Sequence, residues 1–395
     1  MNVLFIGTTD ILGGAAKVSW IIKEALEKRG DAVSMFVADK RSDDDRVHVI
    51  PRQSWRKYVG IALATDTMPN TDWILETKAY QEADIVHCHN LHGRFFNLKT
   101  MQKMSQEKHV VWTLHDEWAI TPHCAYTLEG EAVKHGLFVC PSKHTQPRIL
   151  WDNTKALAGR KISIYKNSKM TVVSPSLWLQ LRVAKTPLGN QALKHIPNGI
   201  DTRAFVRTDK AEARKRLGLP ADKKIALFLA VDAKRNTWKG WRYTREVIDA
   251  YQHDTSVCFV SVGNFIEHED TNQIIHRGHV ADPAELALYY SAADTLLFTS
   301  IAENFPLVIL EAMSVGVPIV AFDVGGVAEV LEHKKHGYVA AYKNVSQLLE
   351  GLRWSLSLSE EQQRLLAQSS GEVIRSKYDV KHMVQNYLQL YQSLL

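Results

Sequence analysis

Hydrophobic and polar residues follow two alternating patterns along this chain. Short apolar runs rich in β-branched and aromatic residues have the length of buried strands, as in 2–7, 31–39 and 257–263. Longer stretches carry apolar residues three and four positions apart, as in 15–29, which is followed by Gly30. The alternation predicts an α/β protein in which helices pack on parallel sheets.

The alternating pattern occurs twice. It runs through residues 1–198 and starts again in residues 199–372, and helical spacing continues in residues 373–395. A chain of 395 residues is long enough for two domains with separate cores. Asn198-Gly199 is a turn sequence that readily adopts positive φ, which suits a chain crossing between domains. We therefore expect one domain in 1–198, a second in 199–372, and terminal helices in 373–395.

One stretch, 303–311, connects a predicted strand to a predicted helix at 308–315. Pro306 suits the first helical turn, where a backbone N–H is not needed. This arrangement places Glu303 in a strand-to-helix loop at the carboxyl end of a strand. It places Glu311 about two turns along the helix.

The start of this helix is a predicted anion site. Backbone N–H groups at Phe305 and Leu307, after Asn304, and the positive end of the helix dipole can bind a diphosphate. Carboxylates on either side, Glu303 and Glu311, can accept hydrogen bonds from sugar hydroxyls. The alternative is that Glu303 is an ordinary loop carboxylate and Glu311 an exposed helix residue.

Composition narrows the class of protein. Apolar residues make up 45% of the chain and charged residues 23%, which is ordinary for a globular protein. No apolar run has the roughly 18–20 residues of a membrane span. The first residues lack the basic region and cleavage site of a signal peptide, so we expect a cytoplasmic protein. Four scattered cysteines agree with that expectation, because nothing in their spacing suggests disulfide bonds.

Charge is distributed unevenly between the two halves. Residues 1–200 contain 26 Lys and Arg against 19 Asp and Glu, a net charge of +7, whereas the whole chain has +5. A basic first half fits an acidic partner or an anionic membrane surface, although ordinary solubility charge explains it equally well. No nucleic-acid-binding module is recognisable, so we expect no nucleic-acid partner.

Several side chains of the first half are placed where ligands bind. Two predicted strands are followed by histidine, at His89 and His115, and carboxyl ends of parallel strands face the ligand crevice. Gly13-Gly14, after the first strand, lets the backbone approach a bound group. This loop lacks the G-x-G-x-x-G spacing of a dinucleotide site, which disfavours an oxidoreductase.

These motifs together resemble a known family. Residues 303–330 contain Glu-Asn-Phe-Pro-Leu, a second glutamate eight positions after the first, and later Gly-Gly and Glu-Val. This string resembles the E-x7-E signature of the retaining glycosyltransferases of family 4, or group 1. Residues 112–121 resemble the subgroup found in colanic-acid, capsule and O-antigen assembly, and 197–201 resemble the family's Pro-Asn-Gly-Ile-Asp domain junction.

The resemblance implies a fold and a set of roles. The expected fold is GT-B, in which two Rossmann-like domains face a central cleft and C-terminal helices pack back on the first domain. Catalytic roles fall to Glu303, beneath the reacting sugar, and His115, which contacts that sugar. The residues implied in donor binding lie in both halves of the chain: Gly13, Gly14, Lys234 or Arg235, Lys239, Asn304, Phe305, Leu307 and, for the ribose, Glu311. The roles of His87 and His89 stay open between ligand binding and core packing.

The resemblance implies no metal and no cofactor, because the nucleotide-diphospho-sugar is a substrate and cations neutralise its diphosphate. Two groups of possible metal ligands, one of aspartates and one of cysteines, have to be weighed against this expectation. Asp43-Asp44-Asp45 has the look of a metal motif, but we interpret it as a solvated loop. Members of the subgroup carry four cysteines where this chain has Cys124 and Cys140 with histidines nearby, so a zinc site is formally possible and not favoured.

The sequence thus predicts a retaining glycosyltransferase. Its donor is a nucleotide-diphospho-sugar, and its acceptor a saccharide or lipid-linked saccharide of surface polysaccharide biosynthesis. Residues 54–63 mix basic, aromatic and aliphatic side chains, so they are either a surface helix or a contact with lipid headgroups at the inner face of the membrane. Two other functions remain open, a non-catalytic nucleotide- or sugar-binding relative and a nucleotide-sugar epimerase of the same fold.

Overall fold

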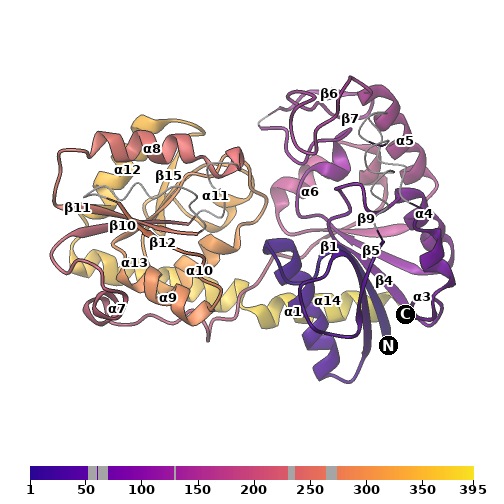
Figure 1. The fold of residues 1–395 in the computed structure, drawn as a ribbon, viewed down its shortest axis with the longest axis horizontal. Helices are drawn as coiled ribbons and strands as arrows, with labels where there is room; N and C mark the ends of the chain where they lie inside the picture. The colour runs from indigo at the N-terminus through magenta and orange to yellow at the C-terminus, as the bar shows by residue number, and fades with distance from the viewer. Residues whose placement is uncertain (52–59, 61–69, 129, 230–235, 264–273) are drawn as a thin grey trace. The chain divides into compact units, whose positions relative to one another are not determined.

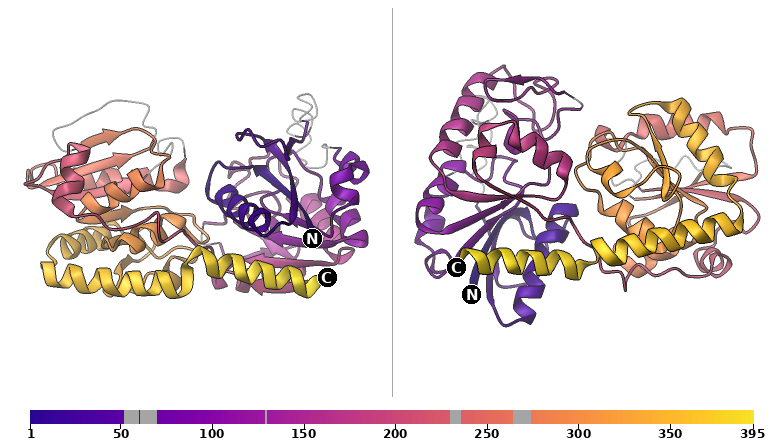
Figure 2. Two further views of the ribbon diagram at one scale, coloured as in Figure 1. Left: turned by 90° about the horizontal axis from the view of Figure 1, so that it is seen from below. Right: turned by 180° about the vertical axis from the view of Figure 1, so that it is seen from behind.

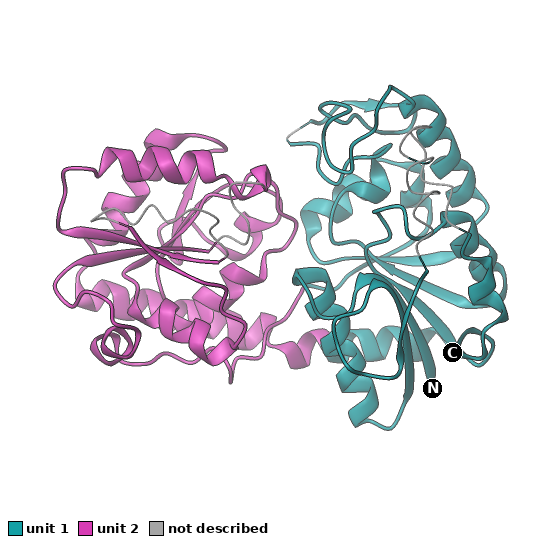
Figure 3. Cartoon of the chain, in the orientation of Figure 1, with its two compact units in different colours: residues 1–197, 384–395 teal, residues 198–383 magenta. Residues whose placement is uncertain are grey.

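The structure is a computed structural model that describes residues 1–51, 60, 70–128, 130–229, 236–263 and 274–395. The chain forms two compact units (Figure 3). Unit 1 consists of Met1–Pro197 and Val384–Leu395, and unit 2 consists of Asn198–Met383. The chain therefore passes from the first unit to the second between Pro197 and Asn198, within the Pro-Asn-Gly-Ile-Asp stretch.

Unit 1 contains a seven-stranded parallel sheet with the order β3-β2-β1-β4-β5-β8-β9. Its strands are β1 (Asn2–Thr9), β2 (Ala32–Asp39), β3 (Val47–Val49), β4 (Ile85–Cys88), β5 (His109–Thr113), β8 (Met170–Ser174) and β9 (Ala192–His195). The helices are α1 (Gly14–Lys28), α3 (Lys78–Gln81), α4 (Leu98–Glu107), α5 (Thr154–Lys166) and α6 (Leu177–Ala184), with 3-10 turns η1 (Asp72–Glu76), η2 (Trp118–Ile120) and η3 (Pro187–Asn190). A two-stranded hairpin, β6 (Val133–Lys134) and β7 (Leu137–Phe138), stands apart from this sheet.

Unit 2 contains a six-stranded parallel sheet with the order β12-β11-β10-β13-β14-β15. Its strands are β10 (Lys224–Leu229), β11 (Val257–Val262), β12 (Ile274–Arg277), β13 (Thr295–Phe298), β14 (Ile319–Phe322) and β15 (Gly337–Ala340). Its helical segments are α7 (Lys210–Leu217), η4 (Thr237–Lys239), α8 (Trp241–Ala250), α9 (Pro283–Ala292), α10 (Leu307–Val315), α11 (Val327–Val330), α12 (Val345–Leu356), α13 (Glu360–Val373) and the π-helical turn η5 (Ile374–Tyr378). Figure 1 shows α8 and α12 on one face of this sheet, and α9, α10 and α13 on the other.

Helices on both faces explain the apolar runs in the sequence. Every residue of β4, β8, β11, β13 and β14 is buried. A strand covered on both sides has no polar face, so it reads as a continuous apolar run. Separate clusters of buried side chains fill the two units, and the sheet of unit 2 carries one cluster on each face.

The last helix, α14 (Val380–Leu394), begins in unit 2 and ends in unit 1. Figure 2 shows the end of α14, marked C, beside the rest of unit 1. Two buried tyrosines anchor this end: Tyr387 Oη lies 3.0 Å from Thr113 Oγ1, and Tyr391 Oη lies 2.6 Å from His87 Nδ1. The expected return of the chain's end to the first domain is therefore confirmed. Residues 373–383 belong to unit 2, so the returning segment is 384–395.

Within the part of the chain that is described, no helix is both long enough and apolar enough to cross a membrane. Residues 54–63, which we expect to form a helix on the surface or the membrane, lie outside the described residues apart from Gly60.

Candidate active site

The loop between β13 and α10 carries Glu303 at the carboxyl edge of the unit 2 sheet. Glu303 Oε1 lies 2.8 Å from Lys239 Nζ, and the two side chains keep 12% and 33% of their surface exposed. Lys239 is the last residue of η4, whose start is capped by the side chain of Asn236. The structure therefore brings together two residues that are 64 positions apart and were assigned separately to the sugar and the diphosphate.

Two glycines allow this loop to pack closely. A Cβ on Gly325 would lie 1.9 Å from the carbonyl oxygen of Glu303, and a Cβ on Gly240 would lie 1.8 Å from that of Thr299. Both glycines also have positive φ, +58° and +68°, which side chains disfavour. Any larger residue at either position would push the loop that carries Glu303 out of place.

Hydrogen bonds hold the same loop from two sides. The backbone N–H of Gly326 donates to the carbonyl of Asn304 over 2.8 Å. The side-chain amide of Asn198 donates to the carbonyl of Phe305 over 3.1 Å. Because the ring of Phe305 is buried, the loop between Glu303 and α10 is fixed by packing as well as by these two bonds.

Helix α10 starts one residue earlier than the predicted 308–315. Its first residue is Leu307, and Pro306 lies before it with extended backbone angles, φ −74° and ψ 121°. Pro306 is thus the N-cap residue of α10 rather than a member of its first turn. The N–H of Ile309 donates to the carbonyl of Pro306 over 3.2 Å, and the N–H groups of Leu307 and Val308 have no partner within the helix, as the anion-site prediction requires.

Glu311 is the fifth residue of α10, closer to its start than the predicted two turns. It is not the exposed helix residue of the alternative interpretation, because only 4% of its surface is accessible. The hydroxyl of Tyr290, on α9, donates to Glu311 Oε2 over 2.9 Å. Burial, together with the neighbouring Glu311 carboxylate, raises the pKa of Tyr290 well above its usual range, so the phenol stays protonated and remains a donor.

In unit 1, the carboxyl ends of β4 and β5 carry a buried histidine cluster. His87 Nε2 lies 2.8 Å from Thr113 Oγ1, and its other nitrogen contacts Tyr391. His89 Nδ1 lies 2.9 Å from Nε2 of the partly exposed His115. Burial lowers the pKa of His87 to about 3 and that of His115 to about 4, and it lowers the pKa of His89 well below the usual range. The three imidazoles are therefore neutral near pH 7.

Gly13, the N-cap residue just before α1, has a φ of 92°, and no atom lies within 4 Å of the place where its Cβ would be. Backbone conformation, rather than crowding, requires glycine here.

The preceding loop is organised by a residue that the sequence analysis missed, the buried Asp10. Its carboxylate accepts hydrogen bonds from the backbone N–H groups of Arg41, at 2.9 Å, and Ser42, at 2.8 Å. Burial acts to raise the pKa of Asp10, but these hydrogen bonds outweigh it and lower that pKa.

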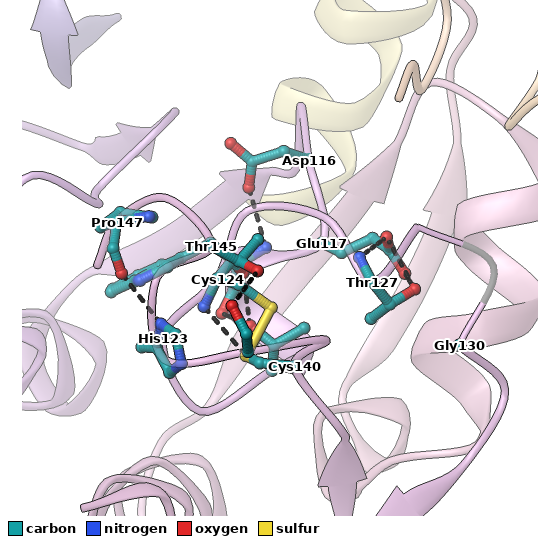
Figure 4. The surroundings of a disulfide bond; sticks show 12 residues. Asp116, Glu117, His123, Cys124, Thr127, Gly130, Cys140, Thr145 and Pro147 are labelled. Carbon is teal, nitrogen blue, oxygen red and sulfur yellow. Dashed lines mark hydrogen bonds between the residues drawn. A yellow bond between two sulfur atoms is a disulfide. The ribbon is translucent and has the colours of Figure 1, made fainter. Parts of the chain in front are cut away.

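The prediction that the cysteines form no disulfide is wrong. Cys124 and Cys140 form a disulfide bond, with their Cα atoms 5.8 Å apart, and Figure 4 shows its surroundings. Cys88 and Cys258 are free and buried. The bond joins positions 16 residues apart in an irregular segment, where spacing alone gives no sign of a pair. Zinc binds thiolates, so this bond gives no support to the disfavoured zinc site, and the nearby His123 contacts the carbonyl of Pro147 at 2.9 Å.

Buried charges hold the same segment in place. Arg182 donates to Glu117 Oε1 over 2.7 Å, and both side chains are almost fully buried. Lys161 donates to the carbonyls of Trp118, at 2.5 Å, and Thr121, at 2.9 Å. Arg182 is the one charged residue in the sequence of α6, which is mostly apolar, and this is the sequence signal that could have indicated its burial.

The acidic run 43–45 is more than a solvated loop. Asp43 and Asp45 are exposed, but Asp44 pairs with the buried Lys23 at 2.5 Å and with Arg46 at 3.1 Å. Burial acts to raise the pKa of Asp44, and the hydrogen bonds from Arg46 and Lys23 lower it strongly.

Among the described residues, no group of three or more histidine, cysteine, aspartate or glutamate side chains is arranged to hold a metal ion. Lys234 and Arg235, the other candidates for the diphosphate, lie outside the described residues.

Two Rossmann-like units, each built on a parallel sheet, define the GT-B class of glycosyltransferases, as expected. Solved structures of this class match over the whole chain. Sucrose-phosphate synthase from Thermosynechococcus elongatus gives a TM-score of 0.73 at 18% identity, covering 100% of this chain and 99% of that one. HepE from Anabaena, solved in complex with UDP, gives 0.70 at 18% identity and covers 100% of both chains.

Within that class, two family models match consecutive parts of the chain. Residues 12–204 match "Glycosyltransferase Family 4", and residues 209–370 match "Glycosyl transferases group 1". The chain belongs to this family of glycosyltransferases, as the motifs indicate. It is 28% identical over 325 residues to the putative colanic acid biosynthesis glycosyl transferase WcaC of Escherichia coli. The aligned region covers 78% of this chain and 76% of that protein.

Proposed function

We propose that this protein is a retaining glycosyltransferase that transfers a sugar from a nucleotide-diphospho-sugar to a saccharide or lipid-linked saccharide in surface polysaccharide biosynthesis. The contact between Lys239 and Glu303 carries the proposal, because it joins a cation for a leaving diphosphate to a carboxylate for a sugar at the start of α10. The likeness to WcaC supports the pathway class, and the UDP complex of HepE supports a nucleotide-diphospho donor.

The chemistry follows from where charge develops. When the anomeric bond breaks, negative charge grows on the departing nucleoside diphosphate, and stabilising that charge lowers the barrier. Lys239 and the N–H groups at the start of α10 supply positive charge and donors for this purpose. We assign the second cation to Lys234 or Arg235, which the family resemblance implies. The donor would therefore be bound without a metal ion.

The sugar is assigned to carboxylate and imidazole groups. Glu303 accepts hydrogen bonds from sugar hydroxyls and stabilises the positive charge of the oxocarbenium-like transition state. His115 is assigned to the donor sugar, as the resemblance implies, and the buried Glu311 accepts from the ribose hydroxyls. We propose departure and attack on the same face of the sugar, which retains the anomeric configuration without a covalent intermediate.

The first experiment identifies the nucleotide. Melting temperatures are measured with UDP, GDP, ADP and CMP, because a ligand that binds the folded state raises the melting temperature. Nucleotide sugars of the best base then serve as donors, and release of nucleoside diphosphate is followed with and without acceptor. Slow hydrolysis of the donor in the absence of acceptor supports the transferase. Conversion of the donor into an epimer, without release of nucleotide, would show the epimerase instead.

Two substitutions test the assigned residues. Glu303→Ala should abolish release and transfer while the melting temperature stays within a few degrees of the parent. Glu311→Ala should weaken binding of the nucleoside diphosphate about ten- to a hundredfold, since a hydrogen bond to a charged group contributes ~1.5–3 kcal/mol. Glu361→Ala, in an exposed pair with Arg364 on α13, is the matched control for both. Turnover of Glu303→Ala close to that of the parent would remove the basis of the proposal.

Metal independence has its own test. Activity should survive EDTA, because the diphosphate is assigned to cations of the chain and a helix end. Loss of activity in EDTA that returns with magnesium or manganese would show that this account of the leaving-group site is wrong.

Membrane association is the proposed feature that depends most on the acceptor. If the acceptor is lipid-linked, the basic first half should bind anionic vesicles at low salt and be released as salt rises, since screening acts within about 8–10 Å. Changing Arg56 and Lys57 to glutamate should weaken this binding and leave nucleotide affinity unchanged. If vesicle binding is absent at low salt, or is indifferent to these two charges, the membrane part of the proposal fails and the transferase assignment stands.

A further inference from the structure

The contact between His89 and His115 fixes which nitrogen of His115 carries the proton. The two residues follow adjacent parallel strands, since Cys88 on β4 pairs with Trp112 on β5. His89 Nδ1 lies 2.9 Å from His115 Nε2, and the rings are nearly parallel, with 17° between their planes. Both rings are neutral, so one nitrogen of this pair donates its proton and the other accepts it.

The surroundings of His89 decide which ring donates. Its Nε2 atom is buried and has no hydrogen-bond partner among the described residues. If His89 accepted at Nδ1, its own proton would sit on Nε2 as a buried N–H without an acceptor, which folded proteins avoid most strongly. Donation from Nδ1 leaves only a bare lone pair at Nε2, on a ring that stacks with Phe5 at a centroid distance of 5.7 Å. His89 therefore donates from Nδ1, and His115 accepts at Nε2.

His89 cannot easily rotate away from this role. Its backbone N–H donates to the carbonyl of Ile6 over 2.8 Å, and its carbonyl accepts from the indole N–H of Trp112 over 2.9 Å. Its side chain is almost completely buried, with the ring of His87 at a centroid distance of 4.2 Å. The donor at Nδ1 is thus preorganised by its neighbours.

We propose that His89 is a positioning residue that holds His115 in the tautomer with its proton on Nδ1, so that His115 donates one hydrogen bond to a hydroxyl oxygen of the donor sugar. This inference rests on the proposed function for the identity of the ligand. His115 then neither takes up nor releases a proton in the reaction. Its contribution is an N–H group of fixed direction on a partly exposed ring.

The charged and titratable neighbours agree with this assignment. Asp116 follows His115 directly, and its Oδ2 atom already accepts from His92 Nε2 at 3.0 Å. His87 is occupied on both nitrogens by Tyr391 and Thr113. Neither neighbour competes with His115 for the proton of His89.

A spectrum of the intact protein tests the proposal directly. With ¹⁵N-labelled histidine, long-range ¹H–¹⁵N correlations distinguish a protonated from a bare ring nitrogen, and His115→Gln assigns the His115 signals. We expect a protonated Nδ1 and a bare Nε2 for His115 near pH 7. A protonated Nε2 in the parent protein would overturn the proposal, whatever the enzyme's activity. This readout is independent of the proposed function, which fails separately if no nucleotide sugar is turned over.

Two substitutions at one position test the role in catalysis. His89→Asn places an amide N–H near the position of Nδ1, so it should keep the tautomer and keep kcat/KM for the donor within about threefold. His89→Asp places an acceptor there, so it should move the proton of His115 to Nε2 and lower kcat/KM by roughly tenfold, the effect of one lost hydrogen bond. His109→Asp, at the exposed opposite end of β5, is the matched control. Should His89→Asp not fold, the parent spectrum and His89→Asn still decide; equal losses in Asn and Asp variants would overturn the positioning role.

Discussion

Changing Glu303 to glutamine should strengthen nucleotide binding while it destroys transfer. Lys239 Nζ lies 2.8 Å from Glu303 Oε1. A nucleoside diphosphate that uses Lys239 must therefore replace this carboxylate as its partner, and it also meets the negative charge of Glu303. Glutamine removes both obstacles, because it is similar in shape and carries no charge.

The size of the gain follows from the exposure of the pair. Fully exposed ion pairs contribute ~0.2–1 kcal/mol, whereas a hydrogen bond to a charged group in less exposed surroundings contributes ~1.5–3 kcal/mol. Lys239 keeps one third of its surface exposed, so we place the free energy of its contact with Glu303 between these two ranges, at about 1 kcal/mol. Since 1.4 kcal/mol corresponds to tenfold in affinity, Glu303→Gln should bind UDP about three- to tenfold more tightly. Turnover should fall by about a hundredfold, as for loss of one preorganised charge interaction in a transition state.

Calorimetric titration with UDP, at low and at physiological salt, measures the affinity. The gain should shrink as salt increases, because salt screens partly exposed charges. Glu361→Gln changes the net charge equally, from an exposed pair on α13, and should leave the affinity unchanged. Unchanged or weaker UDP binding by Glu303→Gln, with a normal control, would show that Lys239 does not serve the diphosphate. An equal gain in the control would show a general charge effect instead.

Three further predictions concern the stability of unit 1. Reducing the disulfide bond between Cys124 and Cys140, which closes a loop of 16 residues, should lower the free energy of unfolding by up to about 3 kcal/mol. Urea unfolding with and without dithiothreitol measures this difference. A variant that carries both Cys124→Ser and Cys140→Ser should not respond to the reductant. Tyr387→Phe removes the hydroxyl 3.0 Å from Thr113 and should lower that free energy by about 1 kcal/mol in the same assay. His87 has a pKa of about 3 when folded against 6.5 when unfolded, so the unfolded chain binds more protons between these values and stability should fall as pH drops from 6.5. His87 alone should contribute about 2 kcal/mol of this loss at pH 5, and His115 and His89, whose pKa values are also lowered, should add to it. Urea midpoints that do not change between pH 7 and pH 5 would contradict this.

The sequence predicted the fold because both sheets are covered by helices. Strands such as β11 and β13 are buried along their whole length, so the apolar run directly reports the strand. Helix ends were predictable where local chemistry sets them. Asp282 caps α9 with its side chain, and Gly316 ends α10 in the left-handed conformation, as their residue types indicate.

Contacts between distant residues could not be predicted in the same way. The bond between Arg182 and Glu117 joins positions 65 residues apart, and Lys23 meets Asp44 from the far end of a helix. Such pairs depend on how elements pack, and no local pattern of polarity records that. Glu311 shows the same limit: its spacing from Glu303 is visible in the sequence, but its burial depends on how α9 packs against α10.

The order in which the chain is made has a consequence for unit 1. Unit 2 is one continuous piece, Asn198–Met383, placed between the two pieces of unit 1. A ribosome therefore completes the sheet of unit 1 and then makes all of unit 2 before Tyr387 and Tyr391 exist. At about 5–20 residues per second, this interval lasts on the order of ten seconds or more. During that time His87 and Thr113 lack the hydroxyl partners that α14 later brings, so the nascent first unit is the part of the chain that most needs protection from aggregation.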